Sequence, residues 1–176
     1  MKISVFGGSQ PTPDSNAYRQ ALELGRLLAE RRHTVLTGGY MGTMEAVSRG
    51  AAEAGGHVIG VTCTEIEKWR AVGANPWIKE EWRRETLIER LQALIGACDS
   101  ALALPGGPGT LTEISLMWNL MIVGVLPPRP LVLIGEGWRS VFDGFFRQFG
   151  DYSPANQRGL LGFAPDPAAA VARLAG

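Results

Sequence analysis

The chain has 176 residues, of which 45% are hydrophobic and 19% charged, and this composition excludes a chain that is disordered throughout. Its 17 Lys and Arg residues balance its 17 Asp and Glu residues, so net charge cannot hold the whole chain on a nucleic acid or an anionic membrane. A local basic pocket for one phosphate is still allowed. The length fits a single domain, which we expect to span residues 1–176.

Segments typical of strands and helices alternate from end to end. Short apolar runs predict strands at residues 2–6, 34–37, 57–61, 101–104 and 130–134, with a last edge strand at 160–163. Apolar residues at helical spacing predict helices at residues 14–32, 43–54, 80–97, 110–123, 138–149 and 167–174. Residues 62–79 form a polar, tryptophan-bearing excursion. Nearly continuous apolar strands, each followed by a helix, predict a doubly wound, Rossmann-like α/β fold: one parallel sheet with helices on both faces.

Several classes of protein are disfavoured by what the sequence lacks. The longest apolar tract, residues 114–126, is too short to cross a bilayer, and the N-terminal apolar run has no signal-peptide cleavage site. Cys63 and Cys98 are too few for a disulfide framework. Together, these observations lead us to expect a cytoplasmic protein without a membrane partner. His33 and His57 lie near no Cys or Asp cluster with which they could bind a metal ion. No lysine occupies a turn after a strand, where it could form a Schiff base with pyridoxal phosphate. We therefore predict neither a metal site nor a cofactor.

Three glycine-rich turns follow predicted strands, at residues 7–9, 38–42 and 105–110. Ligands of such sheets bind beyond the carboxyl ends of the strands, where glycine lets backbone N–H groups approach an anion and a helix N-terminus adds free donors. The turns lack both the GxxxxGK[ST] pattern of P-loop proteins and the GxGxxG pattern of standard NAD sites. They favour a phosphate or nucleotide site, with these candidate binding residues: Gly8, Ser9, Gly38, Gly39, Gly42, Gly106, Gly107, Gly109 and Thr110.

Glu113 is the only charged residue between Thr110 and Pro128, on a predicted helix that is apolar on nearly every side. We expect its carboxylate to lie beside the third glycine turn, shielded from water, with a shifted pKa. A structural alternative is open, because Thr110 and Glu113 also match a capping box, in which the glutamate only returns a hydrogen bond to the backbone.

Two arginines are candidates for a partner of this carboxylate. Arg83 and Arg90 are seven residues apart, which places them on one flank of the predicted helix at residues 80–97. A guanidinium there could lie on apolar surface and point into a cleft, where it would suit a phosphate or a carboxylate. The alternative is a solvated helix face, since several glutamates are nearby.

The segment from Pro105 to Glu113, PGGPGTLTE, resembles the PGGxGTxxE motif of the Lonely Guy (LOG) family. The first turn, VFGGS, and the second, TGGYMGTME, are similar to the other glycine turns of that family, so the resemblance covers about the first 125 residues. The sequence departs from the family pattern in two segments and at one single position. The family's MHxRK reads LIERL at residues 87–91, its GLMG reads GTME at 42–45, and Pro108 occupies the variable position. These departures place the chain among broader LOG-like or molybdenum-cofactor-carrier-like proteins.

The resemblance implies a function and roles for residues. Family members cleave the N-glycosidic bond of nucleoside 5′-monophosphates, and their named activity is cytokinin riboside 5′-monophosphate phosphoribohydrolase. The family's helical arginine falls on Arg90 and its glutamate on Glu113, which become the expected catalytic residues. The ligand is then an AMP-like nucleotide. A non-catalytic nucleotide or molybdenum-cofactor carrier is the alternative. The apolar helix at residues 110–126 further suggests a homodimer.

Overall fold

A computed structural model describes residues 1–174 of the chain. Seven parallel strands form one sheet in the order β4-β3-β2-β1-β5-β6-β7. Their bounds are β1 Lys2–Phe6, β2 Thr34–Thr37, β3 Val58–Cys63, β4 Glu80–Arg84, β5 Ser100–Ala103, β6 Leu131–Ile134 and β7 Gly162–Ala164. The predicted doubly wound parallel sheet is confirmed.

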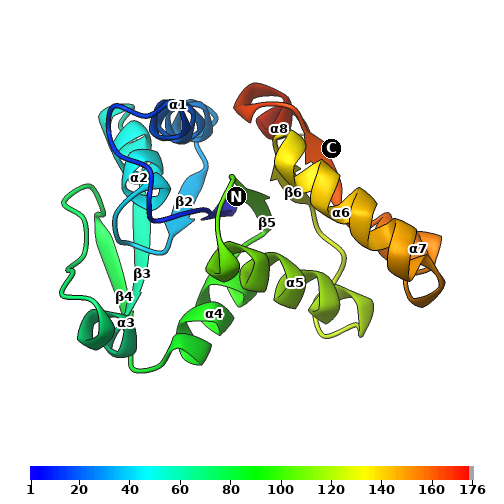
Figure 1. Cartoon of the computed structure of the whole chain (residues 1–176). Helices are drawn as coiled ribbons and strands as arrows, with labels where there is room; N and C mark the ends of the chain where they lie inside the picture. Colours follow the sequence, from blue (N-terminus) through cyan, green and yellow to red (C-terminus); the bar gives the residue numbers. More distant parts are fainter. Residues whose placement is uncertain (175–176) are drawn as a thin grey trace.

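Helices cover both faces of the sheet (Figure 1). They are α1 Asn16–Glu30, α2 Thr43–Glu53, α3 Thr64–Trp69, α4 Leu87–Gly96, α5 Pro108–Ile122, α6 Glu136–Phe149, α7 Ala155–Arg158 and α8 Pro167–Ala172, with a short 3-10 helix at Gly150–Tyr152. Helices α1, α2 and α8 share one buried cluster with Ile3 and Val5 of β1. Helices α4, α5 and α6 share the other with Phe6. Successive residues of β1 thus point to opposite cores, as the pleat of a strand requires.

The sequence-based boundaries are wrong in one important place. Residues 80–84 were predicted as the first part of a helix, but they form strand β4, which pairs only with β3 at the edge of the sheet. Helix α4 begins later, at Leu87, where the Thr86 hydroxyl accepts from the Glu89 N–H and the Glu89 carboxylate accepts from the Thr86 N–H. An edge strand tolerates charges on both faces, so its residues lack the alternation that marks a half-buried strand. The run EEWRR therefore resembled a charged helix.

The order of the strands defines where a ligand can bind. The chain builds β1 to β4 toward one side and then returns to place β5 on the other side of β1. Helices on the two sides of such a switch point cover opposite faces, which leaves a crevice at the carboxyl ends of the strands. The turns after β1 and β5 both lie at this point, and the Gly8 N–H donates to the Pro105 carbonyl at 3.3 Å.

Within residues 1–174, no helix has the length and apolar character needed to span a membrane.

Candidate functional site

The three glycine turns meet at the switch point. In addition to the bond between Gly8 and Pro105, the Gly8 carbonyl accepts from the backbone N–H of Thr43 at 2.9 Å and from its hydroxyl at 3.0 Å. Thr43 is the first residue of α2, directly after the second turn. The first turn is therefore tied to both of the others, and the predicted binding residues lie around one place. Their contacts with a ligand stay a prediction.

The third turn leads straight into α5. Gly107 is the N-cap of this helix without a side-chain cap, and Pro108 occupies the first helical turn, where its missing N–H costs nothing. The following first-turn amides have no partners within the helix. Gly106 packs against the buried Thr110, since an added Cβ would meet Thr110 Oγ1 at 2.1 Å. By contrast, an added Cβ at Gly107 or Gly109 would meet no protein atom within 4 Å. This side of the turn is open.

Glu113 lies one turn into α5 and faces the buried side of the helix. Only 8% of the residue is exposed, and its Oε1 lies 3.8 Å from Nη1 of Arg90, which is also buried. The capping-box alternative is wrong, because the helix begins at Pro108 and both Thr110 and Glu113 lie inside it. The carboxylate turns toward Arg90 instead of toward its own backbone.

Arg90 is held from three directions. Its Nε donates to the Val61 carbonyl at 2.8 Å, its Nη2 donates to the Gly38 carbonyl at 3.2 Å, and its guanidinium lies over the Tyr40 ring, 5.7 Å from the centroid. The solvated-face alternative is therefore wrong for Arg90. Arg83 is exposed and pairs with Glu67, but it lies on strand β4 and not on a helix, so the two arginines do not share one helix flank.

Burial controls the ionisation of Glu113. Removal of Glu113 from water raises the pKa of its carboxyl to about 7, and the positive charge of Arg90 opposes that rise. A carboxyl group with this pKa exchanges its proton near neutral pH, which suits a group that assists bond cleavage. The expected shift of the pKa is thus found, with desolvation as its main cause.

The glycines of the second turn serve the packing of the site. An added Cβ at Gly38 would lie 1.9 Å from Arg90 Nη2, so the absence of a side chain there makes room for the guanidinium. Gly39 and Gly42 both have positive φ, at 77° and 72°, a conformation that strains other residues. Their predicted contact with a ligand is not needed to explain why they are glycines.

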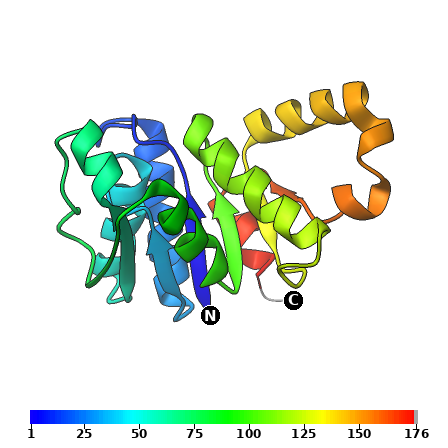
Figure 2. The same cartoon turned by 90° about the horizontal axis from the view of Figure 1, so that it is seen from below.

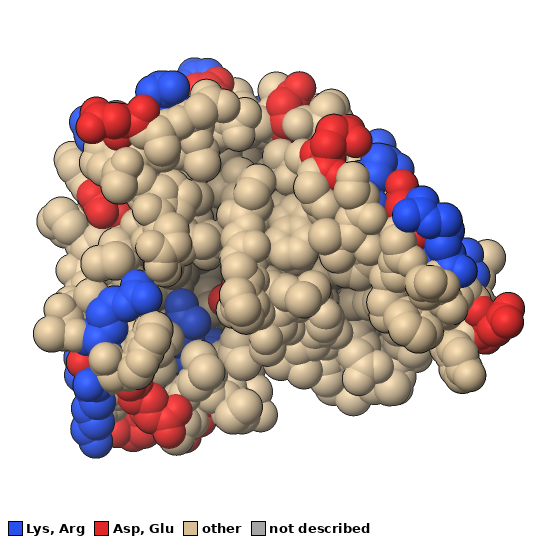
Figure 3. All heavy atoms as spheres, in the orientation of Figure 1, with Lys and Arg blue, Asp and Glu red and all other residues tan. Residues whose placement is uncertain are grey.

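One residue near the site was not singled out from the sequence. Arg70 ends α3, in the excursion between β3 and β4, and its Nη1 lies 3.3 Å from the Ser9 hydroxyl. No periodicity or motif marks this position, because its closeness to the first turn depends on how the excursion folds back. Figure 3 shows a hollow between the left and central parts of the surface. Lys or Arg atoms lie on its rim and inside it, next to a small area of acidic atoms.

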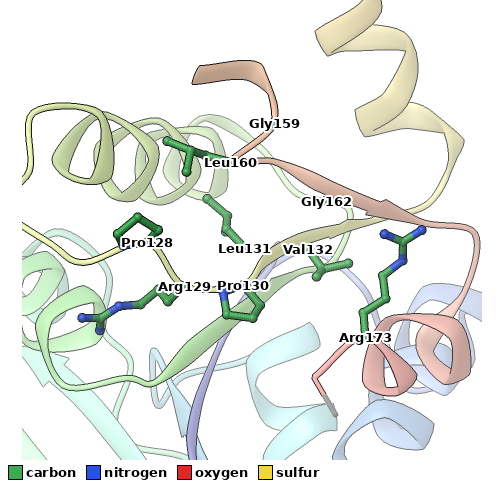
Figure 4. A pocket seen from close by; sticks show the side chains of 9 residues that line it. All are labelled: Pro128, Arg129, Pro130, Leu131, Val132, Gly159, Leu160, Gly162 and Arg173. Atoms are coloured by element: carbon green, nitrogen blue, oxygen red, sulfur yellow. The ribbon is translucent and has the colours of Figure 1, made fainter. Parts of the chain in front are cut away.

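A second hollow lies at the opposite edge of the sheet. It has a volume of about 390 Å³, and Figure 4 shows residues from the starts of β6 and β7 around it. Arg129 and Arg173 lie at its two ends and point in different directions (Figure 4), so they do not converge on one anion. Across the part of the chain that the structure describes, no group of three or more His, Cys, Asp or Glu side chains is arranged to hold a metal ion.

Comparisons with known proteins agree with the motifs. Residues 1–127 match the model of the SLOG cluster4 family. A probable cytokinin riboside 5′-monophosphate phosphoribohydrolase of Oryza sativa is 29% identical over 98% of this chain and 77% of its own length. A cytokinin riboside 5′-monophosphate phosphoribohydrolase of Mycobacterium tuberculosis is 30% identical over 81% of this chain and 73% of its own. Another probable cytokinin riboside 5′-monophosphate phosphoribohydrolase of Oryza sativa is 35% identical over 64% of this chain. The match spans only 46% of that relative's length.

Solved structures share the fold. The molybdenum cofactor binding protein of Rippkaea orientalis superposes with a TM-score of 0.75 at 22% identity, over 98% of this chain and 94% of that chain. The Moco carrier protein of Chlamydomonas reinhardtii superposes with a TM-score of 0.68 at 26% identity, over the same shares.

Proposed function

This chain belongs to the SLOG cluster4 family, as the LOG-type motif indicated, and from that premise we propose that it hydrolyses the N-glycosidic bond of a nucleoside 5′-monophosphate. The products are the free base and ribose 5-phosphate. One observation carries the proposal: a buried carboxylate, Glu113, lies beside a glycine-rich helix start and faces a fixed arginine. Relatives named as phosphoribohydrolases support the reaction class, and a purine base, including the cytokinin type, is the proposed leaving group.

The phosphate is proposed to bind at the start of α5. The first-turn amides there have no helical partners, and the helix contributes about half a positive charge at this end. Open space next to Gly107 and Gly109 gives an anion access to the backbone. A phosphate held there brings the attached ribose toward the first turn of the helix, where Glu113 lies.

The bond that breaks joins C1′ of the ribose to a nitrogen of the base. The electron pair leaves with the base, which takes up a proton, and a water oxygen forms the new bond to C1′ after losing a proton. The transition state resembles an oxocarbenium ion, so an ionised carboxylate near C1′ stabilises it. Glu113 is assigned this role, or the orientation of the water. Arg90 positions Glu113 through their contact and keeps it partly ionised.

Release of base from a nucleotide tests the proposal directly. Purified protein is incubated with a panel of nucleoside 5′-monophosphates, and the free base is measured by chromatography. Glu113→Gln is expected to abolish release, roughly a 100-fold loss or more, while the nucleotide still binds. Glu136→Gln is the matched control, because Glu136 also lies in the first turn of a helix that follows a strand but is exposed. Full turnover by Glu113→Gln would refute the role.

A carrier of a nucleotide or of the molybdenum cofactor is a second candidate. It is supported by the fold shared with the Moco carrier protein of Chlamydomonas reinhardtii and by the altered motif around Arg90 and Glu45. Tight nucleotide or cofactor binding without any release of base would select this candidate over the hydrolase.

A further inference from the structure

Tyr40, in the second glycine turn, packs its ring against the arginine of the site. Only 3% of the residue is exposed, and the central carbon of the Arg90 guanidinium lies 5.7 Å from the ring centroid. The face of an aromatic ring attracts a cation within about 6 Å, and the attraction is stronger where water is excluded. Arg90 is itself buried, so solvent competes little for its charge. The ring therefore limits the positions that the guanidinium can take.

The phenol hydroxyl anchors this ring to the end of β3. It accepts a hydrogen bond from the Cys63 N–H at 2.7 Å and donates to the Cys63 carbonyl at 3.1 Å. Glu67 Oε1, on α3, is a longer alternative acceptor at 3.4 Å, and the Glu67 carboxylate also pairs with Arg83 of β4. A buried hydroxyl that has both a donor and an acceptor is costly to displace. The far end of the ring is thus fixed.

The backbone of Tyr40 is held by the excursion between β3 and β4. The buried Asn75 donates through Nδ2 to the Tyr40 carbonyl at 3.0 Å, and its N–H donates to the Gly39 carbonyl at 2.8 Å. The two ends of Tyr40 are therefore attached to different segments, with the ring between them. A ring fixed in this way cannot follow a moving guanidinium, so it acts as a rigid support.

Few charged groups act on this contact. Arg90, on α4, faces the Glu113 carboxylate of α5 at 3.8 Å. Burial raises the pKa of Tyr40 above its ordinary value, and the nearby Glu67 carboxylate and Cys63 thiol add to that rise. The phenol is therefore neutral near pH 7 and contributes no charge of its own. Its effect on Glu113 can act only through the position of Arg90.

We propose that Tyr40 is a positioning residue of the site, whose anchored ring holds the Arg90 guanidinium opposite Glu113. The hydrogen bonds of Arg90 to the Val61 and Gly38 carbonyls use Nε and Nη2. A tilt about the line through these two atoms would carry Nη1 away from Glu113, and the ring limits that tilt. This inference rests on the proposed function for the reaction that is served, but the pairing can be measured without turnover.

The pKa of Glu113 in the free protein measures whether Arg90 is in place. Protein labelled with ¹³C at the glutamate carboxyls is titrated by NMR, and the Glu113 signal is identified by its absence in Glu113→Gln. In Tyr40→Leu the guanidinium spends less time beside the carboxylate, so its charge opposes desolvation less. The pKa of Glu113 is therefore expected to rise by about one pH unit from its native value of about 7.

Two further variants separate positioning from stability. Tyr40→Phe keeps the ring but leaves the buried Cys63 N–H without its acceptor. Its melting temperature is expected to fall, while the pKa of Glu113 stays closer to the native value than in Tyr40→Leu. Tyr18→Leu is the matched control, because Tyr18 is also 3% exposed but its hydroxyl contacts Glu45 of α2. It is expected to lower the melting temperature without moving the pKa of Glu113.

The outcomes separate this inference from the proposed reaction. A pKa of Glu113 that is unchanged or lower in Tyr40→Leu overturns the inference and leaves the hydrolase intact. An equal rise in Tyr18→Leu also overturns it, because general loosening would then be the cause. A rise confined to Tyr40→Leu in a protein that releases no base supports the placement of Arg90 by Tyr40 and refutes the hydrolase. Should Tyr40→Leu not fold, Tyr40→Met, which fills similar space without a ring face, takes its place with the same expectation.

Discussion

Glu113 and Arg90 are both buried, but their charges are satisfied to different extents. A carboxylate and a guanidinium are costly to remove from water, and a buried pair is stabilising only where further hydrogen bonds satisfy the charges. Arg90 meets this condition through the Val61 and Gly38 carbonyls, but among residues 1–174 the Glu113 carboxylate has only the contact with Arg90 at 3.8 Å. The under-satisfied member is thus the carboxylate, which is the group proposed to meet a developing positive charge. The positive charge that develops on the substrate would supply the close partner that the Glu113 carboxylate lacks in the folded protein.

The ionisation of Glu113 predicts how activity depends on pH. Its pKa is raised to about 7, so the carboxylate form exists above that pH and is lost as the pH falls. If the ionised form assists cleavage, kcat/KM for base release rises through about pH 7 and is roughly 30-fold lower at about pH 5.5 than on the alkaline plateau. Arg90 lowers this pKa, so Arg90→Gln is expected to move the inflection to higher pH. Steady-state rates across the pH range measure both effects. An inflection that stays in place in Arg90→Gln would contradict the coupling of the two residues.

At the scale of elements, the glycine turns combine two kinds of glycine that the sequence cannot separate. Gly38 and Gly106 have no room for a Cβ because Arg90 and Thr110 occupy the space, whereas Gly107 and Gly109 adjoin open space. The first kind supports the architecture of the site. Packing does not require the second kind to be glycine, and the anion proposed to bind there would supply a reason.

This distinction predicts the phenotype of Gly107→Ala. Gly107→Ala is expected to leave the melting temperature nearly unchanged, since nothing lies within 4 Å of the added methyl group, but to weaken AMP binding roughly tenfold by blocking access to the amides. Gly96→Ala is the control, because Gly96 also has open space but ends α4, away from the turns. Thermal unfolding and calorimetric titration give the two readouts. Unchanged AMP affinity in Gly107→Ala would remove the third turn from the phosphate site.

The elements also show what a sequence pattern can and cannot provide. The buried strands and the amphipathic helices were predicted nearly to their ends, because burial on one or both sides forces a periodic pattern. Strand β4 was missed because an edge strand is exposed and charged. Glu113 and Arg90 could be found, since one is a lone charge on an apolar helix and the other follows from a family motif. Arg70 could not, because only the folded path of residues 64–79 brings it to Ser9.

For the whole molecule, the outer surface of α5 is the feature without an explanation within the chain. The helix packs Ile114, Met117 and Met121 into the core, while Leu111 and Val123 remain exposed on the other side. Figure 2 shows α5 running along the outside of the sheet, and Figure 3 shows a broad uncharged area in the region of this helix. Exposed apolar side chains such as Leu111 and Val123 favour an interface where they form one patch. A homodimer through α5 therefore stays our prediction, as does the single domain of residues 1–176.

A charge placed on this surface distinguishes an interface from an ordinary apolar patch. Val123 is 61% exposed at the end of α5, and Val141 is 51% exposed on α6, so both accept glutamate without disturbing the core of one chain. In a dimer that buries Val123, Val123→Glu would place an unpaired charge in the interface. That costs roughly 2 kcal/mol or more and raises the dissociation constant about 30-fold. Light scattering across a concentration series is expected to show a dimer for native protein and Val141→Glu, and a monomer at micromolar concentration for Val123→Glu. A native chain that is monomeric there would mean that α5 is exposed in solution.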